Sequence, residues 1–163
     1  MQKNLISFII IFIFLAVAGF FLFNANRTTG DLVRGSYVKI AGKNIKVELA
    51  TTSAEQQKGL SARTFLAENE GMLFVFDKSG IYSFWMKDMR FAIDIIWLAP
   101  SDVEGIAEVV YIKKDARLEL YPETYGAKNE QGLPLLSKYV LEVVSGFSDK
   151  NNLKVGDKAL FTY

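Results

Sequence analysis

Four carboxylic acids stand where they could take part in acid–base or metal-assisted chemistry: Asp88, Asp94, Glu142 and Asp157. Two carboxylates that face one bond are the catalytic pair of glycoside hydrolases, and carboxylates also hold hard metal ions. The sequence does not set the distances between these groups. A carboxylate-based hydrolase, with or without a hard metal ion, is therefore one hypothesis for this chain. Asp157 itself, in Val155-Gly156-Asp157-Lys158, is interpreted as a turn residue.

Asp94 and Glu142 stand out because each lies within an apolar run. Asp94 shares its face of a predicted strand with Ile96 and Leu98, and Glu142 has valines on its own face. A buried carboxylate is unfavourable unless it is paired or hydrogen-bonded. Each residue can have a purely structural role: Asp94 through an ion pair or hydrogen bonds to loop amides, and Glu142 through an edge strand that lets its carboxylate reach water. Each can also be an acid, a base or a ligand-binding group.

A third candidate is the segment Phe84-Trp85-Met86-Lys87-Asp88-Met89. Strand alternation places Trp85 and Lys87 on one face and Asp88 on the other. An aromatic ring beside a cation can form a platform for a ligand, and a lysine over a tryptophan is itself attractive by about 0.5–1 kcal/mol. A core strand with a charged end explains the same segment without a ligand.

Two cations are candidate partners for the buried carboxylates. Lys87 could pair with Asp94, and Arg63 could hold Asp94 or Glu142 through its two-pronged guanidinium group. A surface position is the alternative for Arg63. The ligand-binding candidates are therefore Arg63, Trp85, Lys87, Asp88, Asp94 and Glu142.

The composition excludes several mechanisms. The chain has no cysteine and no histidine, which removes thiolate and imidazole catalysis, disulfides and cysteine-ligated metal sites. With 19 basic and 18 acidic residues it lacks the basic character of a nucleic-acid-binding protein. No cofactor and no metal ligand set are predicted. No catalytic residue is assigned, and a non-enzymatic role is favoured.

The amino-terminal part of the chain has the length of a membrane span. Residues 5–23 contain no charge, and about nineteen residues of helix cover the hydrocarbon core of a bilayer. A cleaved signal peptide is the alternative, but the exit is bulky where small residues are needed. We predict a retained single-pass anchor at 1–23, a polar tether at 24–36 and one domain at 37–163. Since this domain follows a short amino-terminal tail, it is expected on the extracytoplasmic side, within reach of the bilayer.

The elements that must position the candidates are mostly strands. Residues 37–40 and 45–49 alternate around a turn and predict a hairpin, and Thr52-Ser53-Ala54-Glu55 predicts a capped short helix that ends at Gly59. Another helical turn is expected at 62–67. Strands are predicted at 72–76, 81–86, 93–98, 106–112, 139–144 and 158–163, with a loop or flap at 113–137 and a helical turn at 148–153.

This pattern gives about eight strands with two or three short helices. The connections are too short for repeated parallel crossovers, so we predict a mainly β (α+β) domain. Its sheet is expected to be antiparallel or a partly closed barrel.

Several sequence blocks occur in an order that resembles a known family. They are Val47-Glu48-Leu49-Ala50, Glu55 with Gly59-Leu60 and Arg63, Gly71-Met72-Leu73-Phe74-Val75-Phe76, Phe84-Trp85-Met86-Lys87, Ile93-Asp94-Ile95-Ile96, Val140-Leu141-Glu142-Val143 with Gly146, and Gly156-Asp157. From residue 47 to the end, the chain resembles the DUF192 family, also called UPF0127, whose members are bacterial and archaeal proteins.

The resemblance implies a fold and an anchored or secreted form rather than an activity, and it draws attention to Arg63, Lys87 and Asp94. The chain departs from the family pattern at Asp88-Met89, where Asn-Thr is usual, and at Ala92, where proline is usual. An asparagine amide can donate a hydrogen bond and a carboxylate cannot, so Asp88 puts a shared ligand in doubt.

Three functions remain as hypotheses. The first is a non-catalytic binding or accessory module for a small molecule or protein, with a site formed by Arg63, Trp85, Lys87 and Asp88 under the flap at 113–137. The second is the carboxylate hydrolase, which requires two carboxylates in one cleft. The third is a structural domain whose surface serves a protein partner.

Overall fold

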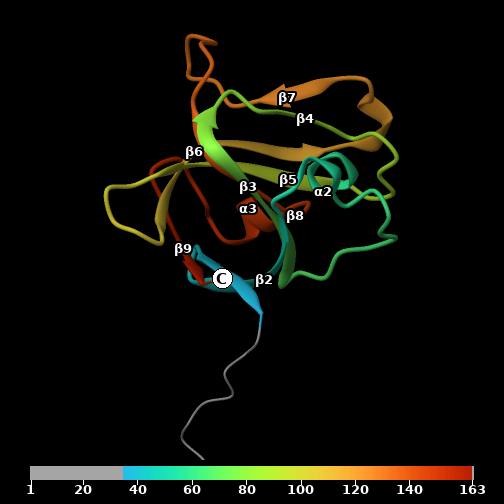
Figure 1. The fold of residues 1–163 in the computed structure, drawn as a ribbon. Helices are drawn as coiled ribbons and strands as arrows, with labels where there is room; N and C mark the ends of the chain where they lie inside the picture. Colours follow the sequence, from blue (N-terminus) through green and yellow to red (C-terminus); the bar gives the residue numbers. More distant parts are fainter. Residues whose placement is uncertain (1–34, 163) are drawn as a thin grey trace, which may run out of the picture. The chain divides into compact units, whose positions relative to one another are not determined.

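The computed structural model describes residues 35–162, and these form a mainly β domain (Figure 1). The strands are β1 (Ser36–Ile40), β2 (Lys43–Ala50), β3 (Glu70–Gly80), β4 (Ser83–Trp85), β5 (Ile93–Pro100), β6 (Ile106–Ala116), β7 (Thr124–Gly126), β8 (Ser137–Val144) and β9 (Lys158–Thr162). The helices are α2 (Ser53–Lys58), α3 (Phe147–Lys150) and the 3₁₀ helix η1 (Leu118–Leu120).

Seven of these strands close into a barrel in the order β1-β2-β3-β8-β5-β6-β9, and β9 pairs with β1 to complete it. Neighbouring strands are antiparallel except β2 and β3, which run parallel. The predicted partly closed barrel is therefore a closed one. Closure leaves β1 without a free edge, which removes a site of unwanted strand pairing.

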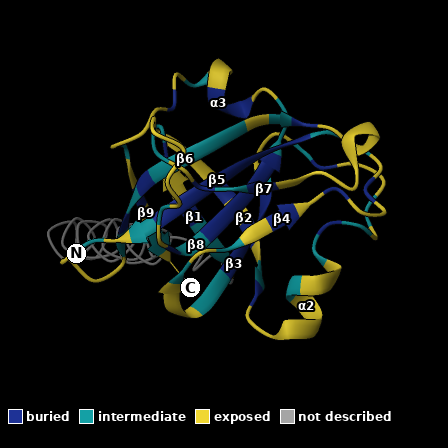
Figure 2. Ribbon diagram, turned by 90° about the horizontal axis from the view of Figure 1, so that it is seen from above, coloured by how far each residue is buried: buried dark blue, intermediate teal, exposed yellow. Residues whose placement is uncertain are grey.

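Side chains alternate between two hydrophobic cores, one on each side of the barrel wall. The inner core contains residues from all seven barrel strands, such as Leu73, Ile96 and Leu141. The outer core includes Phe74 and Trp97, the immediate neighbours of such inner residues along the strands. The ribbon of β4 and β7 lies over β5 and β6, and α2 lies beside β3 (Figures 1 and 2). These elements cover the outer core.

The structure confirms three local features that the sequence predicts: a hairpin turn, a helix cap and a helix end. The hairpin of β1 and β2 turns at Ala41 and Gly42, which both have positive φ. The capping box of α2 is present: the Glu55 amide donates to the Thr52 hydroxyl, and the Glu55 carboxylate accepts from the Thr52 amide at 2.9 Å. Gly59 follows the helix with φ 47°, as a C-terminal glycine should.

Two predicted segments differ from the structure. The helical turn expected at 62–67 is absent; turns and extended backbone occupy that segment. Because β3 runs parallel to β2, the chain must return along the barrel between them, and an extended segment covers that distance better than a helix. The segment at 113–137 is more ordered than a loop: β6 continues to Ala116, η1 follows, and β7 pairs with β4.

The strand expected at 81–86 is also shorter and lies outside the barrel, as β4. The membrane span predicted at 5–23 lies outside the residues that the structure describes. Within 35–162, no helix is long and apolar enough to cross a membrane. Gly35–Tyr163 forms a compact unit of its own. Since both cores and all barrel strands lie in this unit, we expect it to fold without the preceding segment.

Candidate functional site

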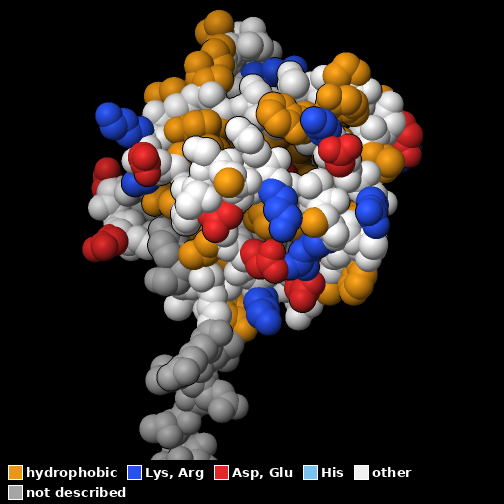
Figure 3. Space-filling model, turned by 45° about the vertical axis from the view of Figure 1, so that its right-hand side comes forward, with side chains coloured by type: hydrophobic (Ala, Val, Ile, Leu, Met, Phe, Trp, Pro, Cys, Tyr) orange, Lys and Arg blue, Asp and Glu red, His pale blue; other side chains and the backbone are white. Residues whose placement is uncertain are grey.

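A cleft of about 320 Å³ opens between α2, β3, and β4 with the residues just before and after it. Its wall includes Gln56, Phe76, Tyr82, Trp85 and Lys87. Figure 3 shows this side of the molecule, where hydrophobic side chains gather in the upper part, near β4 and β7, above mixed acidic and basic side chains. The cleft therefore combines an apolar wall with a few polar groups, which is the usual composition of a small-molecule site.

The α2 side of the cleft is fixed to the barrel by a glutamine. Gln56 Nε2 donates to the carbonyl oxygens of Ala50 and Val75, at 3.3 and 3.1 Å, and so connects the helix to the last residue of β2 and the middle of β3. Gly59 stands where α2 ends. A Cβ atom at Gly59 would lie 3.5 Å from Phe74 and 4.0 Å from the Glu142 carboxylate, so a side chain at this position would contact both groups.

The aromatic side is built as a rigid group of rings. Phe76 and Tyr82 stack with their centroids 3.5 Å apart and their planes at 8°. The Tyr82 hydroxyl donates to the Lys78 carbonyl at 2.7 Å, and the Trp97 indole donates to the Tyr82 carbonyl at 3.0 Å. Because both ends of Tyr82 are held by hydrogen bonds, the stacked pair is ready to receive a flat or apolar ligand without reordering.

Glu142 is the acidic residue of the cleft wall. It lies in β8 between Met72 of β3 and Ile95 of β5, and it is 5% exposed. Its Oε2 atom is fully buried and has no hydrogen-bond partner among the protein atoms that the structure describes. Burial raises the pKa of Glu142 from 4.5 to about 8, because removal from water disfavours the ionised form. At neutral pH this carboxyl group is therefore mostly protonated.

Trp85 and Lys87 border the same cleft, Trp85 as the last residue of β4 and Lys87 just beyond the strand. The Trp85 side chain is 47% exposed, and Lys87 is exposed and makes no ion pair within residues 35–162. The sequence thus identified three residues that the structure brings together: Trp85, Lys87 and Glu142.

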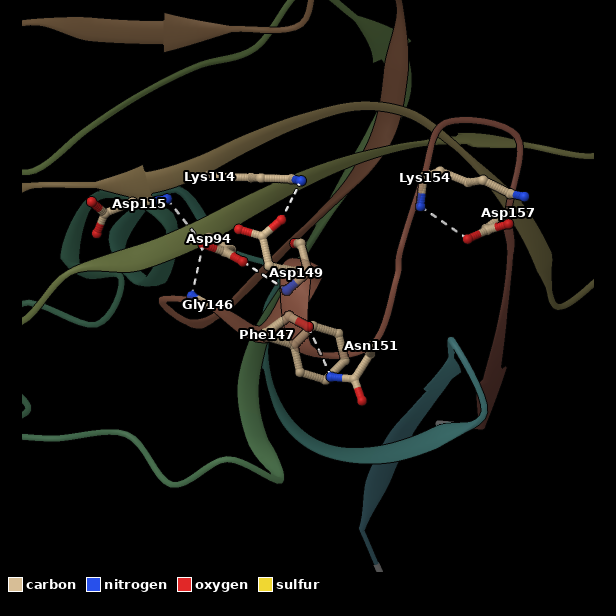
Figure 4. Close-up of polar contacts among 10 residues, drawn as sticks. Asp94, Lys114, Asp115, Gly146, Phe147, Asp149, Asn151, Lys154 and Asp157 are labelled. Carbon is tan, nitrogen blue, oxygen red and sulfur yellow. Dashed lines mark hydrogen bonds and ion pairs between the residues drawn. The ribbon is translucent and has the colours of Figure 1, made fainter.

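Asp94 lies elsewhere, on the inner side of the barrel wall. Its Oδ1 accepts from the amides of Asp115 and Gly146 at 3.0 and 3.2 Å, and its Oδ2 accepts from the Ser148 amide at 2.8 Å (Figure 4). A shift in the pairing of β5 with β6 at Asp94 frees the Asp115 amide for this contact. Asp94 is fully buried, and the three amides replace the cation that the sequence predicted as its partner.

Arg63 and Asp88 are also separate from Glu142. Arg63 pairs with Glu48 and, at 3.4 Å, with Glu70, so it ties β2 to the start of β3 instead of binding Asp94 or Glu142. Asp88 is exposed, has φ 57° and lies outside the cleft wall. The site expected from Arg63, Trp85, Lys87 and Asp88 is thus reduced to its tryptophan and lysine.

Asp157 is a turn residue, as predicted: its Oδ2 accepts from the Lys154 amide at 3.0 Å (Figure 4). Of the four candidate carboxylates, Glu142 alone borders the cleft. No group of three or more acidic residues within the described part of the chain is placed to hold a metal ion. Paired-carboxylate hydrolysis requires a second acid that this cleft does not contain.

Sequence reasoning missed Gln56 and the stacked Phe76–Tyr82 pair. A signal for the rings was present: aromatic residues recur at 74, 76, 82, 84 and 85, on two segments that fold against each other. Gln56 carried no such signal, because its partners lie on two other elements.

The fold and site define a class of protein: a small closed β barrel with a lateral cleft, walled by aromatic rings and containing a buried carboxyl group. The family model of DUF192, described as "Uncharacterized ACR", matches residues 36–161, and the chain belongs to this family. No curated protein matches the sequence.

Two of the solved structures that match the chain are the following. One is a protein of unknown function from Novosphingobium aromaticivorans, with 31% identity and a TM-score of 0.63, over 77% of this chain and 82% of that one. The other is described as a candidate transcription regulator from Sinorhizobium meliloti, with 22% identity and a TM-score of 0.63, over 77% of this chain and 91% of that one. The second likeness concerns the fold alone.

Proposed function

We propose that this domain is a binding module that holds a small organic molecule in the cleft beside α2. The observation that carries the proposal is the Glu142 carboxyl, buried in the cleft wall with its Oε2 atom lacking a partner. A buried polar group that is left unsatisfied costs about 1–3 kcal/mol. A ligand that hydrogen-bonds to Glu142 offsets this cost. If Glu142 had only a structural role, the cost would destabilise the domain and nothing would offset it.

The remaining wall supports the same proposal. At about 320 Å³ the cleft is at the lower end of the range for small-molecule sites, roughly 300–1,000 Å³. The stacked Phe76–Tyr82 pair and the exposed Trp85 offer flat apolar surface, and Lys87 offers a charge at the mouth. Such a site favours a ligand with an aromatic or aliphatic body and one deep polar group.

A fragment screen on residues 35–163 tests this function. Thermal shift and ligand-observed NMR should find fragments that bind, and Trp85→Ala should weaken them several-fold. Leu133→Ala is the matched control, because Leu133 is 61% exposed and does not border the cleft. Fragments that bind the Trp85→Ala protein as well as the wild type, or a complete absence of binders, would refute the proposal.

The proposed place of action is the outer face of a membrane, with residues 1–23 as the anchor and 24–36 as the tether. This part of the proposal rests on the uncharged run at 5–23. In a bacterial host, the full chain should stay with the membrane after alkaline extraction. Alkaline phosphatase fused after residue 163 should be active. An intact but inactive fusion would put the domain on the cytoplasmic side, and an amino terminus that begins beyond residue 23 would show a cleaved signal.

A further inference from the structure

We infer that the ligand of this cleft carries an organic ammonium group, which pairs with the Glu142 carboxylate while the body of the ligand lies against the aromatic wall. This inference rests on the proposed binding function and names the chemical class of its ligand. It follows from what surrounds Glu142, from the aromatic rings that border the same cleft and from the exposure of the two lysines there.

The protein itself provides no cation or donor for Glu142. Its neighbours across the two adjacent strands are Met72 and Ile95, which are apolar. The other titratable groups that border the cleft are Lys58 at the end of α2, Tyr82 before β4 and Lys87 after it. None of them makes a hydrogen bond or an ion pair with Glu142 in the part of the chain that the structure describes. A carboxylate in this position lacks a cation, and an ammonium group supplies both the charge and the hydrogen bonds.

The aromatic wall favours the same chemical class. The faces of phenyl, phenol and indole rings attract cations, by about 0.5–1 kcal/mol when exposed and about 2 kcal/mol when water is excluded. Phe76, Tyr82 and Trp85 border the same cleft as Glu142. A positively charged ligand is thus attracted by two groups in this cleft, the faces of the aromatic rings and the Glu142 carboxylate.

The positive charges of Lys58 and Lys87 repel a cationic ligand, but this repulsion is weak. Both side chains are exposed, so water and salt screen their charges over about 8–10 Å. Glu142 is buried, so the charge that it carries once its proton has left is not screened by water. A ligand that reaches Glu142 therefore interacts with the carboxylate far more strongly than with the two lysines.

Binding should release a proton. Since burial raises the pKa of Glu142 to about 8, the free cleft holds a neutral carboxyl group at neutral pH. An ammonium ligand then exchanges with that proton: the carboxyl O–H breaks, its proton passes to the buffer, and the carboxylate accepts N–H bonds from the ligand. Affinity for the amine should therefore rise with pH up to the pKa of Glu142. A neutral ligand that accepts the carboxyl O–H would behave in the opposite way, with affinity that falls above this pKa.

A matched panel of arylalkylamines and their alcohols, such as benzylamine and benzyl alcohol, tests the inference on residues 35–163 by titration calorimetry. Amines should bind more tightly than the alcohols of the same shape, and their affinity should rise by about tenfold per pH unit from about pH 6 to about pH 7.5. Titration in two buffers of different ionisation enthalpy should show release of close to one proton. Glu142→Gln should abolish the proton release and the preference for amines, and Leu133→Ala should leave both unchanged.

Alcohols that bind at least as well as the amines, or amine affinity that is constant over this range, would overturn the inference while leaving the cleft as a binding site. A panel in which no amine binds would overturn it as well. The proposed function fails separately, if the fragment screen finds no ligand that is sensitive to Trp85.

Discussion

Replacement of Glu142 with glutamine should remove a large pH dependence from the stability of the domain. In the folded state, burial raises the pKa of Glu142 to about 8, whereas the unfolded chain has the ordinary value of 4.5. Between these two values the folded protein holds a proton that the unfolded protein has released. Stability therefore decreases as pH rises through this window, and it levels off above the folded-state pKa.

The magnitude follows from the two pKa values. Each pH unit in the window lowers the free energy of unfolding by up to 1.36 kcal/mol, so the full window corresponds to about 4–5 kcal/mol. Glutamine has nearly the same shape and no charge at any pH. Relative to the wild type, Glu142→Gln should be about equally stable near pH 5 and about 3–5 kcal/mol more stable near pH 8.

Urea unfolding of both proteins between about pH 5 and pH 8.5 measures this difference directly, since other titrating groups cancel in the comparison. Glu130→Gln is the matched control: Glu130 is exposed and makes no side-chain hydrogen bond or ion pair within residues 35–162, so its removal should not alter the pH profile. Parallel profiles for wild type and Glu142→Gln would refute the reasoning, because they would mean that the Glu142 carboxyl is ionised in the folded protein.

Three further substitutions test individual contacts on which the fold depends. Asp94→Asn should destabilise the domain by about 1–3 kcal/mol, because an amide N–H would face the Ser148 amide in place of Oδ2. Urea unfolding checks this, with Asp102→Asn as the exposed control, and equal losses would contradict it. Gly71→Ala should lose about 1–3 kcal/mol in the same assay, since a Cβ atom would lie 2.6 Å from the Glu142 carbonyl oxygen; a neutral result would mean that β3 and β8 separate easily. Thr52→Ala should cost about 1 kcal/mol through loss of the α2 cap, seen as a lower melting temperature that Ser53→Ala does not share.

The elements that the sequence predicted well depend on neighbours in the chain. The hairpin turn at Ala41 and Gly42 and the cap of α2 at Thr52 involve contacts across four residues or fewer. The turn at Asp157 is of the same kind. Side-chain types at short range determine these features, because turn and cap geometry leaves few alternatives.

The site could be predicted only in part, because it depends on contacts between distant segments. Trp85 and Lys87 were recognised together since they are two residues apart in the chain, at the end of β4 and just after it. The partners of Arg63 were not, because Glu48 and Glu70 reach it through the parallel pairing of β2 and β3. The sequence does not specify that this pair is parallel. The helical turn expected after α2 was wrong for the same reason.

Asp94 and Glu142 show how two similar sequence environments lead to different chemistry. Asp94 lies where the ladder of β5 and β6 is interrupted, so the amides of Asp115, Gly146 and Ser148 are free to solvate it. Glu142 lies opposite Met72 on one side and Ile95 on the other, within continuous pairing. Its neighbouring amides are used by the sheet, and none can turn toward the side chain. A carboxyl group buried in uninterrupted sheet must obtain its hydrogen bonds from outside the backbone. The described protein side chains around Glu142 supply none, and we propose that a ligand does. This contrast with Asp94 is the main support for the proposed binding role.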